Sequence, residues 1–169
     1  MKTVGFIISN QNFRDEELFY PLDILEAKGI KNIIISLEKK ECFGKLGAKI
    51  EPDLALEDVN INDFDAIVFV GGAGCRDFWY NNIAHKICQD MKNSKKLLAS
   101  ICSSVATLAY AGVLNGVRAN SFKTEREILK DNGAILSDDG LVFDEKHKIL
   151  TANGTEMAKD FGKKILEIL

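Results

Sequence analysis

The stretch Leu97-Leu98-Ala99-Ser100-Ile101-Cys102-Ser103-Ser104 decides how this chain is expected to fold. It begins as an apolar run typical of a buried strand and changes abruptly at Cys102, after which residues 105–112 have the pattern of a helix. Ser100 and Ser104 stand two residues before and after the cysteine. Small residues at both places let a strand and a helix cross closely, as a nucleophile elbow requires. The pattern therefore predicts a thiol presented at the end of a strand.

Two interpretations of Cys102 stay open on this pattern alone. Free cysteine is among the most buried residue types, so a cysteine at a strand end is often inert core. A thiol at a helix N-terminus, in contrast, feels unpaired N–H groups and the positive end of the helix dipole, which favour the thiolate. The small residues on both sides favour the reactive interpretation.

Outward from this elbow, short β-branched runs alternate with stretches of helical period, which predicts a parallel sheet wrapped by helices. Pro21 is expected to kink the first helix or mark its start, and Thr155 to cap the last one. The pattern predicts one α/β domain over residues 1–169. The expected strands are 4–9, 33–37, 66–70, 97–101 and 117–121, with a small β-excursion over 42–50 and a hairpin over 141–151; the expected helices are 18–28, 79–91, 105–112, 124–130 and 157–168.

Composition limits the classes of function. The 169 residues include 22 Lys and Arg against 25 Asp and Glu, a formal charge of −3, which is the wrong sign for a general nucleic-acid binder. The first residues carry only a short apolar run without a cleavage site, so neither a signal peptide nor a membrane anchor fits, and we expect a cytoplasmic protein. The four cysteines are then expected to be free thiols.

Two further strand ends carry candidate residues, because ligand sites of open α/β sheets lie at the carboxyl ends of the strands. The turn Gly71-Gly72-Ala73-Gly74 does not complete a G-x-G-x-x-G motif, since Asp77 stands where the last glycine would be. It fits either a tight turn or a set of backbone N–H groups that face an oxyanion. Glu16 and Glu17 open the first helix, where acidic residues usually complement the helix dipole.

The two histidines offer no catalytic base. His85 lies between Ile83 and Ile87 but on the opposite side of the expected helix, so it should point to solvent, and His147 falls in the turn of the hairpin. No set of zinc ligands is present, so we expect neither a metal nor another cofactor.

Four motifs together resemble the ThiJ/PfpI superfamily, the group of the parkinsonism-associated deglycase and of archaeal intracellular peptidases, related to class I glutamine amidotransferases. They are residues 15–21, 71–74, 99–102 and 150–155, and they follow the order of the family from about residue 2 to 168. The resemblance implies an α/β fold of the flavodoxin-like type: a three-layer sandwich with a mainly parallel sheet, helices on both faces and a nucleophile elbow. It also implies a homodimer.

The resemblance further implies roles for particular residues. Cys102 is the reactive cysteine, and Glu17, four residues before a proline, contacts its sulfur. Gly71 and Gly72 form the pocket wall with backbone N–H groups, and Ser103 contributes the N–H of the elbow.

This sequence also departs from the family pattern. Peptidase-like members have a histidine directly after the cysteine, where this chain has Ser103, and other members place a histidine near the position of Ser121. Without a Cys–His dyad, proteolysis lacks its general base, so peptidase activity is disfavoured.

What remains is a Cys102–Glu17 pair, which we expect to share one proton as a thiolate beside a carboxylic acid. One hypothesis is a cofactor-independent enzyme of the glyoxalase or deglycase type that acts on 2-oxoaldehydes, a small carbonyl substrate. The alternative is a redox sensor or stress chaperone in which peroxide oxidises Cys102 to the sulfinate. Cys75 is a candidate resolving thiol in that case, and buried core filler is the more common role for such a cysteine.

Overall fold

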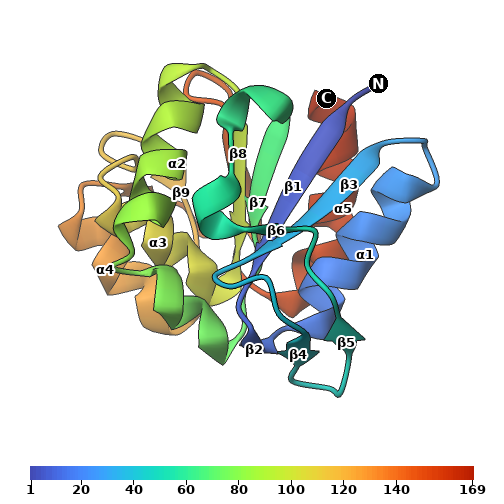
Figure 1. The fold of residues 1–169 in the computed structure, drawn as a ribbon. Coiled ribbons are helices and arrows are strands. Elements are labelled where there is room, and N and C mark those ends of the chain that lie inside the picture. The colour runs from blue at the N-terminus through green and yellow to red at the C-terminus, as the bar shows by residue number, and fades with distance from the viewer.

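The computed structural model describes all residues, 1–169, and is built on a central seven-stranded sheet (Figure 1). The strands lie in the order β11-β12-β8-β7-β1-β3-β6, and every neighbouring pair is parallel except β11 and β12, which form an antiparallel hairpin. Their bounds are β1 (Thr3–Ile8), β3 (Lys31–Ser36), β6 (Leu54–Ala55), β7 (Ala66–Phe69), β8 (Leu97–Ile101), β11 (Leu141–Asp144) and β12 (Ile149–Ala152).

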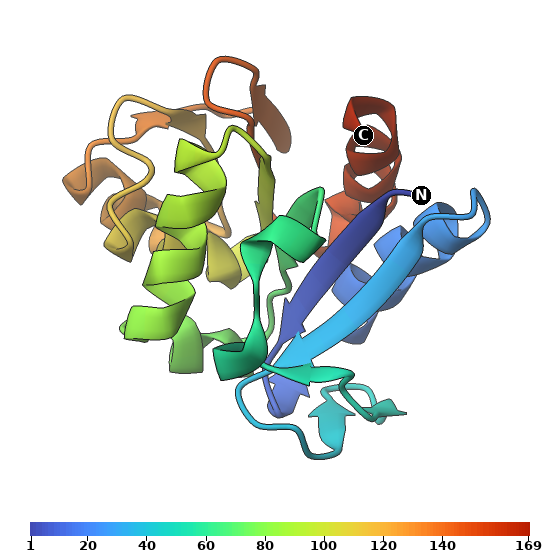
Figure 2. The same cartoon turned by 45° about the horizontal axis from the view of Figure 1, so that its top comes forward.

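Helices cover both faces of this sheet, as Figures 1 and 2 show from two directions. One face carries α1 and α5, and the other carries α2 and α3 with α4 beside them. The order β3-β1-β7-β8-β12 is the parallel order of flavodoxin-like sheets, so the predicted three-layer sandwich is confirmed. The bounds are α1 (Asp15–Glu26), α2 (Asn82–Asn93), α3 (Val105–Tyr110), α4 (Arg126–Asp131) and α5 (Ala158–Ile168).

Strand β1 shows why the sheet sits between two cores. Its side chains alternate, so that Val4, Phe6 and Ile8 join the apolar cluster on the α1 and α5 side, while Ile7 joins the cluster under α2 and α3. All four are fully buried. A strand covered on both faces needs apolar residues at every position, which explains the unbroken apolar runs of the sequence.

Two small sheets flank the central one. Strand β2 (Gln11–Phe13) pairs with β4 (Cys42–Gly44), which pairs with β5 (Lys49–Ile50), so the predicted β-excursion is confirmed. The strand predicted over 117–121 is only β9 (Arg118–Ala119), which lies outside the central sheet and pairs with β10 (Ile135–Leu136). The residues after β9 are consequently free to turn toward the elbow.

Predictions about three helix ends need correction. Pro21 does not mark the start of α1 but lies inside it, and the helix begins earlier, at Asp15; a kink at Pro21 stays a prediction. Thr155 does not cap α5, because it lies in a short 3-10 turn before that helix and its hydroxyl is bonded elsewhere. Helix α2 does not include Trp79, since the side chain of Asn81 caps its first turn through the Ala84 N–H at 2.9 Å.

The late start of α2 changes which side chains are buried. Ile83, expected in the apolar stripe, is 43% exposed, and the buried face uses Ala84, Ile87 and Met91 instead. His85 does not point freely to solvent, because its Nε2 lies 2.6 Å from the carbonyl oxygen of Trp79.

Helices α1 and α5 pack closely where Pro21 meets Gly162. A Cβ atom at position 162 would lie 2.7 Å from the Cα atom of Pro21, so only glycine allows this approach. The Pro21 ring has no N–H to donate to the carbonyl oxygen of Glu17, one turn earlier.

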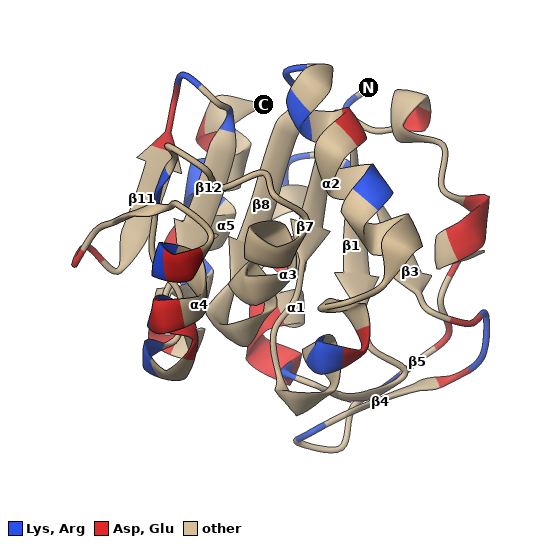
Figure 3. Ribbon diagram, turned by 90° about the vertical axis from the view of Figure 1, so that its left-hand side faces the viewer, with Lys and Arg blue, Asp and Glu red and all other residues tan.

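Most positions of Lys, Arg, Asp and Glu lie on the helices and connecting loops, and the central strands β1, β7 and β8 carry none (Figure 3). Within the structure, no helix combines the length and the apolar character that crossing a membrane requires.

Candidate active site

Cys102 lies on a strained elbow between β8 and α3. Its φ angle is 63°, in the left-handed region that residues with a side chain rarely adopt. Ser104 is buried below it and donates to the carbonyl oxygen of Phe69 at 2.8 Å, and its Oγ lies 2.7 Å from Oγ of Ser100. The small residues therefore lie where strand and helix cross, and the half-buried cysteine is held above them.

Glu17 approaches the elbow from α1 and is fully buried. Its Oε2 accepts the N–H of Gly71 at 3.0 Å, and its Oε1 accepts the hydroxyl of Thr155 at 2.9 Å. Each of the two carboxylate oxygens thus accepts one hydrogen bond, an arrangement that suits an ionised carboxylate. The ends of β7 and β12 thus hold in place a side chain that comes from α1.

The neighbouring acid has a different environment. Glu16 stays near the surface and pairs with Arg14, with 2.8 Å between Oε2 and Nε. The positive charge of Arg14 lies close enough to lower the pKa of Glu17. Asp15, the third acidic residue of the motif, accepts the N–H groups of Leu46 and Ala48, so only Glu17 reaches the elbow.

Gly71 leaves no room for a side chain between the two reactive groups. A Cβ atom there would collide with the Glu17 carboxylate and lie 2.8 Å from Cβ of Cys102. Gly72 has a φ of 101°, and a Cβ atom there would collide with the backbone of Asn12 and Arg14. Both glycines are required by the turn. The N–H of Gly71 is engaged by Glu17, so it does not face an open oxyanion site.

Burial disfavours the charged forms of both Cys102 and Glu17. Burial raises the pKa of Cys102 to about 12, and the negative charge of Glu17 acts in the same direction, while the Ser103 N–H opposes both. Burial also raises the pKa of Glu17, against the hydrogen bonds from Thr155, Cys102 and Gly71. Desolvation thus acts on both members of the pair, and the expected thiolate beside a carboxylic acid stays a prediction.

A second buried carboxylate lies beyond Ser103. The hydroxyl of Ser103 is 4.0 Å from Sγ of Cys102 and donates to Oε2 of Glu125 at 3.1 Å. The same oxygen accepts the hydroxyl of Thr124 at 2.7 Å, and Glu125 is only 2% exposed. The indole N–H of Trp79 fixes the Ser103 carbonyl at 3.2 Å. Sequence reasoning missed Glu125, because a glutamate beside a short helix looks like a surface residue.

Cys75 lies beneath the glycine turn and is fully buried. Burial raises its pKa, and the negative charges of Cys102, Glu17 and Glu125 add to that effect. All four cysteines are free, and the role of Cys75 as a resolving thiol stays a prediction.

A polar cavity of about 510 Å³ adjoins the elbow. Two of its residues touch the site directly: Thr155 donates to Glu17, and the backbone N–H of Phe122 donates to the Cys102 carbonyl at 3.3 Å. Cys102 itself is not among the lining residues. The cavity is lined by Asn120, Ser121, Phe122, Lys123, Arg126, Asp138, Asn153, Gly154, Thr155 and Glu156.

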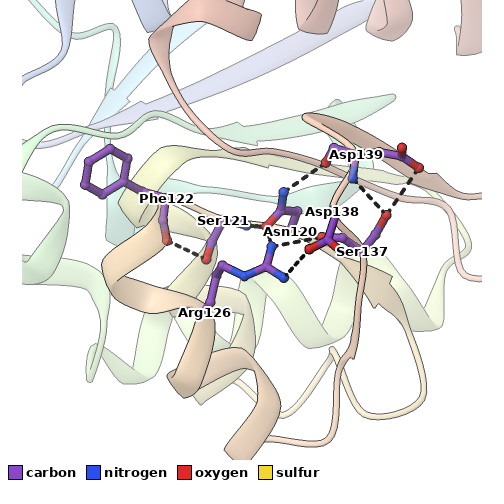
Figure 4. A network of polar contacts seen from close by, with 7 residues as sticks. All are labelled: Asn120, Ser121, Phe122, Arg126, Ser137, Asp138 and Asp139. Atoms are coloured by element: carbon purple, nitrogen blue, oxygen red, sulfur yellow. Dashed lines mark hydrogen bonds and ion pairs between the residues drawn. The ribbon is translucent and has the colours of Figure 1, made fainter.

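Arg126 organises one wall of this cavity (Figure 4). Its guanidinium donates to the side chain of Asn120, to the Ser137 carbonyl at 2.9 Å and to Asp138 at 2.9 Å. Ser121, near the position where other family members place a histidine, is buried and donates to the Phe122 carbonyl at 3.0 Å. No group of three or more His, Cys, Asp and Glu side chains is arranged to hold a metal ion.

Fold and site together define a class of protein: a parallel α/β sandwich whose nucleophile elbow presents a cysteine to a buried glutamate. Residues 2–168 match the model of the DJ-1/PfpI family, and the chain belongs to this family. The resemblance to the ThiJ/PfpI superfamily is thereby confirmed.

Individual relatives agree with this assignment. A deglycase of Thermococcus kodakarensis is 35% identical over 138 residues, covering 82% of this chain and 83% of that protein. A glutathione-independent glyoxalase of Caenorhabditis elegans is 24% identical, covering 99% of this chain and 89% of that protein. The crystal structure of a ThiJ/PfpI domain protein from Brachyspira murdochii superposes with a TM-score of 0.94 at 30% identity, covering 98% of this chain and 95% of that one.

Proposed function

We propose that this protein is a cofactor-independent enzyme that converts 2-oxoaldehydes, or their adducts on amino groups, with Cys102 as nucleophile and Glu17 as base. The observation that carries the proposal is the buried Glu17 carboxylate, held by Gly71 and Thr155 beside the thiol of the elbow. The relatives named deglycase and glyoxalase support the same chemistry.

The first step of the proposed reaction adds the thiol to the aldehyde. As Sγ of Cys102 attacks the aldehyde carbon, the S–H bond breaks, and the proton passes to Glu17 and on to the aldehyde oxygen, giving a hemithioacetal. A raised thiol pKa is no obstacle here, because the proton leaves only as the S–C bond forms. Oxidant and reductant are both unnecessary.

The second step moves a proton between two carbons. Ionised Glu17 removes the hydrogen of the former aldehyde carbon and returns it to the neighbouring carbonyl carbon. The hydroxyl proton of the hemithioacetal passes to the oxygen of that carbonyl, which becomes an alcohol, while the sulfur-bearing carbon becomes a thioester. Water then hydrolyses the thioester to a 2-hydroxy acid and frees the thiol. The sum is one 2-oxoaldehyde and one water giving one 2-hydroxy acid.

The cavity beside the elbow supports the adducts as substrates. About 510 Å³ is within the range of roughly 300–1,000 Å³ typical of small-molecule sites and exceeds what a three-carbon aldehyde needs. The amino component of an adduct would occupy this space, with its polar groups against Asn120, Asn153 and Thr155.

The test compares the purified protein with its Cys102→Ala and Glu17→Gln variants, on methylglyoxal and on the methylglyoxal adduct of an N-acetylated amino acid. Proton NMR follows loss of substrate and appearance of lactate. We expect lactate from the wild type alone. A wild-type rate equal to that of buffer on both substrates would refute the proposal.

The alternative is a redox sensor or stress chaperone that uses the same sulfur. Two peroxide molecules would oxidise the Cys102 thiol in two steps to the sulfinic acid, with one water released at each step. The half-buried position of Cys102, accessible to a small oxidant, favours this alternative. Mass spectrometry after mild peroxide treatment distinguishes sulfinate at Cys102 from a Cys75–Cys102 disulfide. A homodimer and a cytoplasmic location also stay predictions.

A further inference from the structure

We propose that Asn153 is a modification site: the fold leaves its side-chain amide and the backbone nitrogen of Gly154 free to cyclise, so that Asn153 becomes aspartate or isoaspartate in the native protein. Asparagine is a thermolabile residue, and this cyclisation is fastest where glycine follows, because glycine has no side chain that hinders the approach. The modification needs no substrate, so it does not depend on the proposed function.

The glycine nitrogens of the three Asn-Gly steps differ in their hydrogen bonds. These steps are residues 115–116, 132–133 and 153–154. The N–H of Gly116 donates to the Gly133 carbonyl at 2.9 Å, and the N–H of Gly133 donates to the Lys130 carbonyl at 3.0 Å. The N–H of Gly154 donates to no group of the protein. Because a hydrogen-bonded amide nitrogen keeps its proton and its planar geometry, the nitrogen of Gly154 is the one free to act as a nucleophile.

The asparagine side chains of the three steps differ in the same way. The amide of Asn132 donates to the Ile128 carbonyl at 2.8 Å, and Oδ1 of Asn115 packs against Gly133. The side chain of Asn153 is half-buried in the wall of the cavity beside the elbow, and its amide makes no hydrogen bond within the protein. Nothing in the protein therefore holds the Asn153 amide away from the next backbone nitrogen.

Backbone conformation explains two of the three glycines and not the third. Gly116 and Gly133 have φ angles of 73° and 82°, in the left-handed region that favours glycine. Gly154 has a φ of 163°, which is extended backbone that any residue adopts, and a Cβ atom there would meet only Phe122 at 3.8 Å. The fold does not require glycine at position 154, and the effect of glycine there is to leave the nitrogen unhindered.

The reaction consumes one water and releases one ammonia. The nitrogen of Gly154 gives its proton to solvent and bonds to Cγ of Asn153, while the bond from Cγ to the side-chain nitrogen breaks and ammonia leaves, which closes a succinimide ring. Water then opens the ring at Cγ, giving aspartate, or at the main-chain carbonyl carbon of residue 153, giving isoaspartate. Nothing is oxidised or reduced.

The modified residue lies two positions before a donor of the site. Isoaspartate lengthens the main chain by one methylene between β12 and Thr155, whose hydroxyl donates to Oε1 of Glu17 at 2.9 Å. Either product also adds a negative charge to a cavity wall that otherwise carries two basic and two acidic side chains. Modification at Asn153 therefore loosens the hold on Glu17 and makes the cavity more negative.

The first experiment follows all three steps in one sample of the native protein. After prolonged incubation at mildly alkaline pH, peptide mass spectrometry measures replacement of the amide by a carboxyl group, and a protein isoaspartate methyltransferase labels isoaspartate. We expect Asn153 to react severalfold faster than Asn115 and Asn132. The same incubation in denaturant should bring the three rates together, since each asparagine precedes a glycine. Equal rates in the native protein, or a preference for Asn153 that persists after unfolding, would overturn the proposal.

The second experiment uses Gly154→Ala, which the open space around that position should allow to fold as the wild type does. A methyl group on residue 154 hinders the approach of its nitrogen, so modification at Asn153 should nearly stop, while the rates at Asn115 and Asn132 should stay unchanged. Thermal melts verify the fold. Modification of Asn153 at the wild-type rate in this variant would contradict the cyclisation through residue 154.

A third measurement connects the modification to the site. Turnover of methylglyoxal by the incubated wild type should fall in proportion to the isoaspartate fraction, whereas incubated Gly154→Ala should keep the turnover of its own fresh sample. Full turnover by a protein converted to isoaspartate would overturn the effect on Glu17. A fresh wild type without any turnover would refute the proposed function, and the mass measurements would still decide whether Asn153 is modified.

Discussion

Two buried carboxylates flank the same sulfur and are held in different ways. Glu17 comes from the first turn of α1, and one of its two oxygens accepts a backbone N–H, that of Gly71. Glu125 comes from the turn before α4, and both of its donors are side-chain hydroxyls. Glu17 is therefore fixed in part by a rigid backbone N–H besides the Thr155 hydroxyl, whereas Glu125 is held only by hydroxyls, which can rotate.

The comparison also shows how burial acts on a reactive site. Burial raises the pKa of Glu17 and of Cys102 alike, because it disfavours the charged form of each group. The negative charge of Glu17 raises the pKa of Cys102 further, so the two acids resist being ionised together.

The largest expected effect comes from removing the sulfur that both carboxylates serve. Cys102→Ala should lower methylglyoxal consumption to the rate in buffer, and adding Glu17→Gln or Glu125→Gln to it should change nothing further. Lactate formation measured by NMR checks this. If either carboxylate variant still altered the rate without the sulfur, the two would not act through Cys102.

The next largest effect concerns Glu17, whose replacement should lower turnover but make Cys102 easier to alkylate. Glu17→Gln should lower turnover by about 10²- to 10⁴-fold, because the base is lost. The same change should shift the alkylation profile of Cys102 to lower pH, because the negative charge of Glu17 raises the pKa of the thiol. Loss of both turnover and alkylation would instead indicate a misfolded elbow.

A change at the turn between the two groups should act on both activity and stability. Gly71→Ala places a methyl group against Glu17 and Cys102, and overpacking of this kind costs about 1–3 kcal/mol in free energy of unfolding. Gly154→Ala is the control for stability, since a Cβ atom there meets only Phe122 at 3.8 Å. Chemical denaturation measures the difference; equal stability of the two variants would contradict the geometry.

A smaller effect is expected from the donor on the second oxygen of Glu17. Thr155→Val removes a hydrogen bond worth about 1 kcal/mol, so turnover should fall about fivefold. Because that bond lowers the pKa of Glu17, the acid limb of the pH–rate profile should move to higher pH. Thr155→Ser keeps the hydroxyl and should keep the profile; a shift there would point to the lost methyl group.

The smallest effect concerns the folding stability that is lost because the Glu17 carboxylate is buried. The pKa of Glu17 is raised on folding above its ordinary value of 4.5, so the folded state binds more protons and stability falls as pH rises through the folded pKa. Glu17→Gln should therefore unfold at a higher temperature than the wild type at neutral pH, and the advantage should vanish below about pH 4.5. Thermal melts at both pH values test the sign.

The sequence predicts the scaffold well because its signals are local. The apolar runs define the central strands, and the small residues around Cys102 define the elbow. The residues that tune the elbow are harder to find. Thr155 acts on Glu17 from 138 positions away, while the local rule for helix caps suggested another task for it. Glu125 is buried only because the chain after β9 turns back toward the elbow.

The protonation state of Cys102 is hard to predict from sequence for a related reason. Helix dipoles can be inferred from sequence, but desolvation depends on how many atoms surround the sulfur in the folded protein. Local sequence also could not show that the N–H of Gly71 is occupied by Glu17, since the partners come from different elements.

The contact between Pro21 and Gly162 links the position of Glu17 to the C-terminal helix. Glu17 and Pro21 are one turn apart on α1, so any change that pushes α5 outward moves the base relative to the sulfur. The reactivity of the site at the strand ends therefore depends on the packing of two helices that lie away from the substrate. Substitutions made at this helix contact to raise thermal stability would also change the reactivity of Cys102.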